Sequence, residues 1–170
     1  MAKDWKLKQR KPVRHKKLKN LFSRLTEPIG LELDLTTAFL EQAEYGPWSL
    51  LIVNRSPLAM EVSIEEGSDR VAFPTLRGLL AWNPSKKWCE VDHGAIPFLL
   101  NGADCMAAGI HACCNSVEEG DLVWIRDQEH GKPLAIGWAS MSSDEMITAT
   151  GGKAVKTIHN VGDELWELEL

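Results

Sequence analysis

The apolar and polar positions near the amino terminus follow first the period of a strand and then that of a helix. Residues 5–10 alternate as a short edge strand does, and Pro12 fits the first turn of a following helix. Pro28 and Gly30 are expected to end that helix. Its buried face is predicted from four apolar residues at i, i+3, i+4 and i+7 spacing: Leu18, Leu21, Phe22 and Leu25.

Further along the first half, the pattern predicts two more helices and three strands. Residues 35–44 favour a helix that the Gly46-Pro47 pair would end, and residues 75–82 favour a shorter one. Clusters of turn-forming residues separate three strand-like runs between these helices. An antiparallel meander is therefore expected over residues 48–53, 58–64 and 71–73.

The second half contains mostly short strand-like runs, with one helix expected at residues 95–101. The Asp92 carboxylate is predicted to cap this helix, and Gly102 is predicted to stop it. Ser142 and Glu145 have the spacing of a capping box for one helical turn. Such a mixture indicates a small mixed barrel, with strands at residues 88–91, 121–126, 134–141, 153–159 and 165–168.

The two halves are expected to be separate domains of an α+β protein. Residues 1–86 form the predicted small amino-terminal α/β domain, and residues 87–170 form the mixed β pseudobarrel. Neither half contains a long Gly/Ser-rich or Pro-rich linker. The two domains are therefore expected to pack closely.

Charge is distributed unevenly along the chain, whose net charge is −5. Residues 1–24 contain ten of the nineteen Lys and Arg residues and one acidic residue, so the net charge of residues 25–170 is −14. A basic segment on an acidic body directs a polyanion to one place, although a solvated helix face that aids solubility is the alternative. We call the segment the basic arm, and its predicted phosphate-binding residues are Lys6, Lys8, Arg10, Lys11, Arg14, Lys16, Lys17 and Lys19.

The motifs of several enzyme classes are missing from the sequence. There is no Walker phosphate loop, no Gly-x-Gly-x-x-Gly fingerprint and no Gly-x-Ser-x-Gly elbow, so we expect a binding protein that is not an enzyme and has no cofactor. The usual spacing of a zinc site is also missing, which favours core thiols over a metal. The soft ligand types considered for a metal are Cys89, His93, Cys105, His111, Cys113 and Cys114.

The amino terminus stays charged over residues 1–6, and no apolar run approaches the roughly 20 residues that cross a bilayer. We therefore expect a cytoplasmic protein with no membrane partner. Cysteines are reduced in that compartment.

Four ordered segments resemble a known family. Residues 91–110 contain Val-Asp-His-Gly-Ala, an apolar helix, Gly-Ala-Asp and Met-Ala-Ala-Gly-Ile, and they resemble the opening of a PUA domain. Ala108 stands where a proline often precedes the glycine. Residues 120–125, 135–139 and 152–166 resemble later strands and the closing segment of that domain. The resemblance implies a PUA-type pseudobarrel that binds RNA.

The first half narrows the resemblance. Residues 73–77, Phe-Pro-Thr-Leu-Arg, resemble the Tyr-Pro-Thr-Leu-Arg of the malignant T-cell amplified sequence family, whose archaeal-type members join a pre-PUA domain to a PUA domain. Eukaryotic members and the related ligatin proteins are associated with the small ribosomal subunit, initiator tRNA delivery and reinitiation. The resemblance thus implies a role in translation.

Candidate RNA-binding residues lie around the helix that opens the PUA-like segment. Gly94 and Ala95 leave its amino terminus bare, so its amides and the positive end of its dipole are expected to hold a phosphate. Gly102 and Ala103 permit close backbone approach, and the resemblance adds the strand residue Met106. Four lysines are expected to neutralise phosphate without specifying sequence: Lys86, Lys87, Lys153 and Lys156.

Each candidate has a structural alternative. The glycines would serve only turns, and the lysines would be solvated surface. Residues 98–100 are expected to be mostly core, with one of them exposed, and Trp166 is also expected in the core. His159 is expected to be a hydrogen-bonded structural residue.

The main hypothesis is an RNA-binding protein of translation that contacts tRNA or the small ribosomal subunit through the PUA-like helix and the basic arm. One alternative is an accessory factor in ribosome assembly or RNA modification. Another is a protein-interaction adaptor whose acidic body binds a basic partner.

Overall fold

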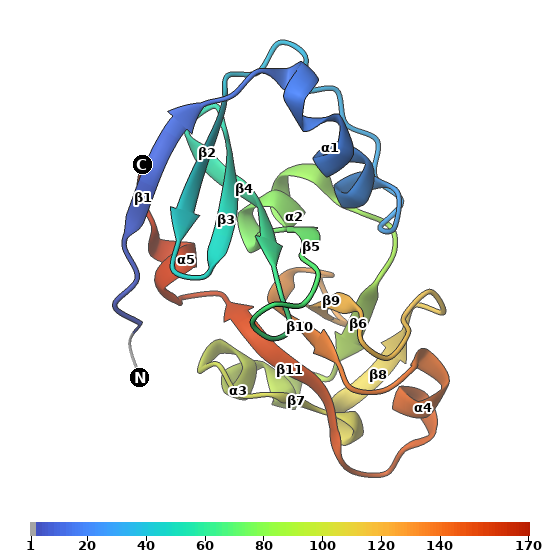
Figure 1. Cartoon of the computed structure of the whole chain (residues 1–170). Coiled ribbons are helices and arrows are strands. Elements are labelled where there is room, and N and C mark those ends of the chain that lie inside the picture. Colours follow the sequence, from blue (N-terminus) through green and yellow to red (C-terminus); the bar gives the residue numbers. More distant parts are fainter. Residues whose placement is uncertain (1–2) are drawn as a thin grey trace. The chain divides into compact units, whose positions relative to one another are not determined.

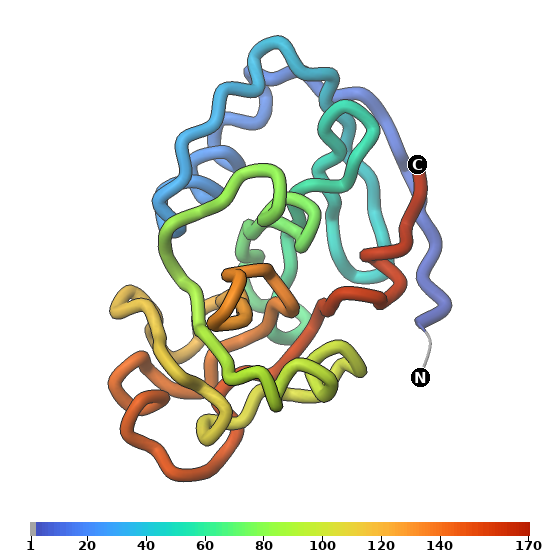
Figure 2. The backbone as a smooth tube through the Cα atoms, turned by 180° about the vertical axis from the view of Figure 1, so that it is seen from behind, coloured from blue at the N-terminus to red at the C-terminus, as the bar shows by residue number. Residues whose placement is uncertain are grey.

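The computed structural model describes residues 3–170; the first two residues of the predicted domain 1–86 lie outside the described part. The chain divides into two compact units (Figure 1). The amino-terminal unit comprises the residues up to Pro84 together with Leu168–Leu170, and the carboxyl-terminal unit comprises Ser85–Glu167. The carboxyl-terminal residues return to the amino-terminal unit (Figure 2).

The amino-terminal unit is built on a five-stranded antiparallel sheet whose spatial order follows the sequence. The strands are β1 (Leu7–Pro12), β2 (Leu40–Tyr45), β3 (Trp48–Val53), β4 (Ser56–Val62) and β5 (Val71–Pro74). The helical segments are η1 (His15–Leu18), α1 (Lys19–Thr26) and α2 (Leu76–Trp82). Leu18, Leu21 and Leu25 are buried, so the predicted apolar face of the helix is confirmed. The meander is confirmed as well.

Two predictions for this unit are wrong. The predicted helix over residues 35–44 is wrong, because residues 40–44 belong to strand β2, which pairs with both β1 and β3 and buries Leu40, Ala43 and Tyr45. This pairing overrides the helix propensity of its Glu, Gln and Ala residues. Pro12 ends strand β1 and does not begin a helix.

A six-stranded mixed sheet forms the carboxyl-terminal unit, in the order β7-β11-β10-β9-β6-β8. The β6–β9 pair is parallel and the others are antiparallel. The strands are β6 (Trp88–Val91), β7 (Cys105–Met106), β8 (Ile110–Cys113), β9 (Leu122–Asp127), β10 (Pro133–Ala139) and β11 (Lys153–Asn160). The helical segments are η2 (His93–Ala95), α3 (Ile96–Leu100), η3 (Ala107–Gly109), α4 (Ser143–Thr148) and α5 (Glu164–Glu167). The α+β prediction is confirmed.

Several local predictions for this unit are also tested. Ser142 and Glu145 form the predicted capping box at the start of α4, and Gly102 ends α3 with φ of +84°. Asp92 occupies the N-cap position, but its side chain makes no capping hydrogen bond. The predicted final strand at residues 165–168 is instead the helical turn α5. Strands β7 and β8 had no counterpart in the predicted pattern, and β7 is only two residues long.

Among residues 3–170, no helix combines the length and the apolar character that crossing a membrane requires.

Candidate nucleic-acid interface

A groove of about 370 Å³ lies between the η2–α3 segment and the β7–η3 segment. Gly94, Ala95 and Phe98 line it from one side, and Met106 and Gly109 line it from the other. We call it the α3 groove. It brings together three of the predicted RNA-binding residues, Gly94, Ala95 and Met106. The other two backbone candidates, Gly102 and Ala103, follow the far end of α3 and do not line the groove.

Glycine keeps the entrance of the groove open. Gly94 is exposed, and a Cβ placed on it would meet no atom within 4 Å. Its backbone is therefore accessible to a ligand from outside. At the other end of α3, the Ala103 amide donates to the Phe98 carbonyl at 3.0 Å, which closes the helix after Gly102.

Large apolar side chains are exposed around the groove. Phe98 leaves 67 % of its surface accessible, Met106 49 % and Leu100 39 %, whereas Leu99 is buried at 1 %. Two of residues 98–100 are thus exposed where the sequence predicted one. Clustered apolar side chains on a surface indicate a binding site, and an exposed phenyl ring offers a face on which a base stacks.

The helix amino terminus provides fewer amide donors than the sequence analysis predicted. The Ala95 amide donates to the Asp92 carbonyl at 3.0 Å, and the Ile96 amide donates to the His93 carbonyl. Pro97 has no N–H group. Helix α3 is only five residues long, so its dipole is also small. The predicted phosphate site at this helix end therefore needs support from side chains.

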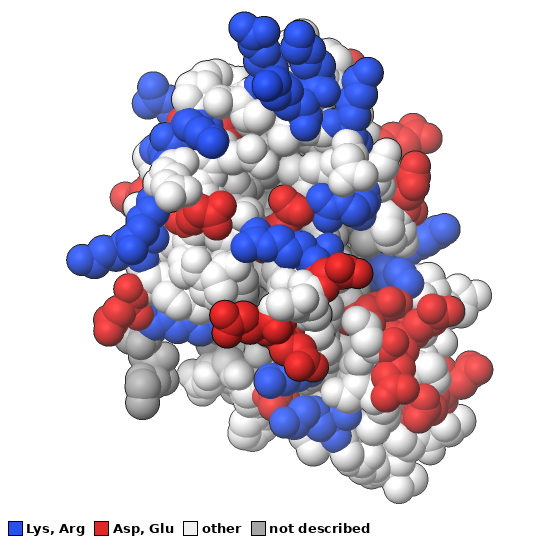
Figure 3. Space-filling model, viewed as in Figure 1, with Lys and Arg blue, Asp and Glu red and all other residues white. Residues whose placement is uncertain are grey.

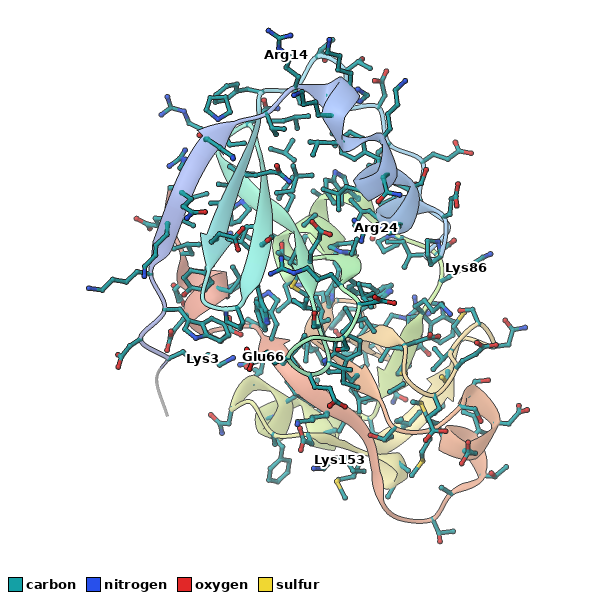
Figure 4. All side chains as sticks on the ribbon, in the orientation of Figure 1. Lys3, Arg14, Arg24, Glu66, Lys86 and Lys153 are labelled. Carbon is teal, nitrogen blue, oxygen red and sulfur yellow. The ribbon has the colours of Figure 1, made fainter. Side chains whose placement is uncertain are left out.

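Lys153 is the cation that the fold brings next to the groove. It pairs with Met106 in the β7–β11 register, and its Nζ lies 2.8 Å from the Asp104 carboxylate (Figure 4). Burial raises the pKa of Asp104, but hydrogen bonds from Lys153 and from the Thr157 amide outweigh burial and leave this pKa below its usual value. Lys156 is exposed on the same strand.

None of the four lysine candidates lines the α3 groove itself, and Lys86 and Lys87 lie elsewhere in the chain. Lys87 is half-buried, and its Nζ donates to the Ser116 carbonyl and to the Asp121 carboxylate, both at 2.6 Å. These bonds give Lys87 a structural role within the unit. Lys86 is exposed, and its carbonyl accepts a hydrogen bond from the Trp124 indole.

From Leu7 on, the basic arm is folded as strand β1 and the helices that follow it. Arg10 forms a two-point ion pair with Glu41, at 2.9 and 3.0 Å. The lysines of the arm are exposed, and basic side chains gather over η1 and the start of α1, around Arg14 (Figures 3 and 4). The basic side chains are therefore presented from a rigid surface.

Two further expectations concern the closing segment. His159 is buried, with 1 % of its surface exposed, and its Nδ1 lies 2.8 Å from the Asp163 carboxylate, so its structural role is confirmed. Trp166 is only half-buried, which corrects its predicted place in the core.

Comparison with known proteins identifies the class. A family model described as PUA domain matches residues 87–161. A hypothetical protein from Pyrococcus horikoshii has the same fold over 95 % of this chain and 100 % of its own, with a TM-score of 0.78 and 31 % identity. The structure is therefore that of a PUA-domain protein.

The relatives among curated proteins define the family. An uncharacterised protein of Methanocaldococcus jannaschii is 36 % identical over 154 residues, which are 91 % of this chain and 88 % of that protein. Translation machinery-associated protein 20 of Saccharomyces cerevisiae is 32 % identical over 58 % of each chain. A malignant T-cell-amplified sequence 1 homologue of Drosophila melanogaster is 29 % identical over 64 % of this chain and 65 % of its own. The chain belongs to the same family as the Methanocaldococcus protein, and it resembles the malignant T-cell amplified sequence proteins.

Proposed function

We propose that this protein binds RNA in the α3 groove and acts in translation. The observation that carries the proposal is the open groove with exposed Phe98 and Met106 beside the cations of β11. Phe98 stacks on an unpaired base, Met106 packs against its sugar or edge, and Lys153 and Lys156 neutralise the neighbouring phosphates. Gly94 lets the RNA backbone approach the start of α3.

The PUA match supports RNA as the partner, and the relatives named for the translation machinery support the process. The proposed RNA is tRNA or small-subunit ribosomal RNA. We therefore expect the protein to act in the cytoplasm. Its proposed role is to bind RNA without catalysing a reaction. In the same proposal, residues 87–170 form the domain that recognises a particular RNA feature. Residues 1–86 form the domain that adds electrostatic affinity through the basic arm.

Replacing Phe98 with Ala is expected to weaken RNA binding by about 5- to 160-fold, because stacking of one base on an aromatic ring contributes about 1–3 kcal/mol. Met106→Ala should weaken binding by a smaller factor. Fluorescence anisotropy with labelled tRNA, at one fixed salt concentration, measures both. Ile147→Ala is the matched control, because Ile147 is also an exposed apolar side chain, at 52 %, but lies on α4. An affinity that Phe98→Ala leaves unchanged would remove the groove from the mechanism.

A separate prediction concerns the effect of the basic arm on the salt dependence of RNA affinity. Changing Lys16, Lys17 and Lys19 together to Gln should reduce the slope of log K against log salt by roughly 2–3, because each neutralised phosphate contributes about 0.7–0.9. Charge substitution is required here, because deleting the arm would remove β1 from its pairing with β2. Lys132→Gln, at an exposed turn of the other unit, should leave the slope nearly unchanged. An equal slope for the triple variant and the unaltered protein contradicts a role for these three lysines.

A further inference from the structure

Three sulfur atoms from distant parts of the sequence meet in the carboxyl-terminal unit. The Sγ atoms of Cys89 and Cys113 are 3.6 Å apart. The Sδ atom of Met146 lies 3.6 Å from the Cys89 sulfur and 3.7 Å from the Cys113 sulfur. The three distances are nearly equal, and we call this group the sulfur triangle.

The fold fixes each corner of the sulfur triangle. Cys89 and Cys113 are directly opposite each other in the antiparallel β6–β8 pair. Met146 lies on α4, whose start is held by its capping box and which packs against β8. Cys89 and Met146 are buried, with 0 and 1 % of their surfaces exposed, whereas Cys113 is half-buried. Cys89 and Met146 are therefore shielded from water, whereas Cys113 gives access from solvent.

The size of the triangle suits a small soft metal ion. An ion at its centre would lie about 2.1 Å from each sulfur, close to the length of about 2.3 Å for a metal–thiolate bond. Thiolate and thioether sulfurs together select Cu(I), whereas structural zinc takes four ligands from Cys, His and carboxylates. Among residues 3–170, no three His, Cys, Asp or Glu residues are grouped to hold a metal. The third ligand here is a methionine.

We propose that Cys89, Cys113 and Met146 bind one Cu(I) ion in trigonal geometry. Each thiol gives up its proton to solvent as its sulfur binds the ion, and the oxidation state of copper does not change. Cys113 is the half-buried corner, whereas Cys89 and Met146 are buried, so the ion enters at the Cys113 sulfur.

The test is an anaerobic titration of the reduced full-length protein with Cu(I) in competition with a chromophoric Cu(I) chelator. One equivalent of copper should stay with the protein and produce a thiolate-to-copper charge-transfer absorption in the near ultraviolet. X-ray absorption should report three sulfur neighbours at about 2.3 Å. Failure of the protein to compete with the chelator overturns the proposal, and two sulfur neighbours in place of three would exclude Met146.

Variants separate the sulfur triangle from the other sulfur atoms of the chain. Cys113→Ala should abolish retention of copper. Met146→Leu keeps the size and apolar character of the side chain and should weaken binding by about tenfold or more, since even groups outside a coordination shell change metal affinity by that much. The matched controls Cys105→Ala and Met141→Leu remove the same residue types elsewhere in the unit and should bind copper normally. Thermal unfolding of each metal-free variant verifies that it is folded, and undiminished binding by folded Cys113→Ala contradicts the proposal.

Discussion

Replacing Gly137 with Ala is expected to lower the free energy of unfolding of the carboxyl-terminal unit by roughly 3 kcal/mol, the upper part of the range for overpacked interiors. A Cβ at this position would lie 2.2 Å from the Lys156 carbonyl oxygen and 2.7 Å from its carbon, both on the neighbouring strand β11. Backbone atoms cannot move aside as a flexible side chain does, so β10 and β11 would have to separate. The β10–β11 register shifts between Ile136 and Gly137, so this close approach is part of an irregularity in the pairing.

Differential scanning calorimetry measures this effect as a fall of roughly 10–25 °C in the melting temperature of the unit, since 1 kcal/mol shifts a domain of this size by about 4–8 °C. Gly151→Ala is the control, because a Cβ there meets no atom within 4 Å. A melting temperature equal for both variants would show that β11 accommodates the methyl group.

Removing the Asp163 carboxylate should lower the free energy of unfolding by a similar amount. This carboxylate lies 2.8 Å from His159 Nδ1 and accepts hydrogen bonds from the Asn160 and Trp166 amides, both at 2.9 Å. Asp163→Ala leaves these groups without their acceptor, and we expect a loss of roughly 3 kcal/mol or more, because each buried unsatisfied donor costs about 1–3 kcal/mol. Urea unfolding at pH 7 measures the difference, and a loss below about 1 kcal/mol would mean that water replaces the carboxylate.

Asp163 also links stability to pH. Burial raises its pKa, but the interactions with His159 and the two amides outweigh burial and hold this pKa below its usual value. A depressed carboxyl pKa stabilises the folded state at pH values above the unfolded pKa of about 4, and this contribution disappears as the pH falls through the folded value. The stability difference between the unaltered protein and Asp163→Asn should therefore shrink as the pH falls below about 4. A difference that stays constant as the pH falls contradicts the linkage.

Local patterns of the sequence predicted most of the elements because they depend on neighbours along the chain. The apolar spacing of α1, the meander and the capping box of α4 are of this kind. Strand β2 was predicted as a helix because its residues favour helices in isolation, and only its two neighbouring strands make it extended. Strand β7, with two residues, is too short to show an alternating pattern.

The candidate site residues also divide into those that the sequence predicted and those that depend on tertiary packing. Met106 followed from a family resemblance, but the exposure of Phe98 depends on what α3 packs against, which no local pattern contains. The sulfur triangle depends most strongly on tertiary packing. Sequence considerations placed Cys89 and Cys113 among soft ligand types, but Met146 is 57 residues from Cys89 and was not among them. Its place depends on how α4 packs on the sheet.

The position of β1 at the edge of its sheet has a consequence for association between molecules. An edge strand presents unpaired backbone groups to which a strand of another copy could add. Here the edge carries Lys8, Arg10 and Lys11, and its pairing with β2 is interrupted between Lys8 and Lys11, where Gln9 has φ of +54°. Repulsion between like charges and a break in the ladder both oppose polymerisation. Neutralising Lys8 and Lys11, by acetylation for example, would weaken the first of these two barriers and leave the second.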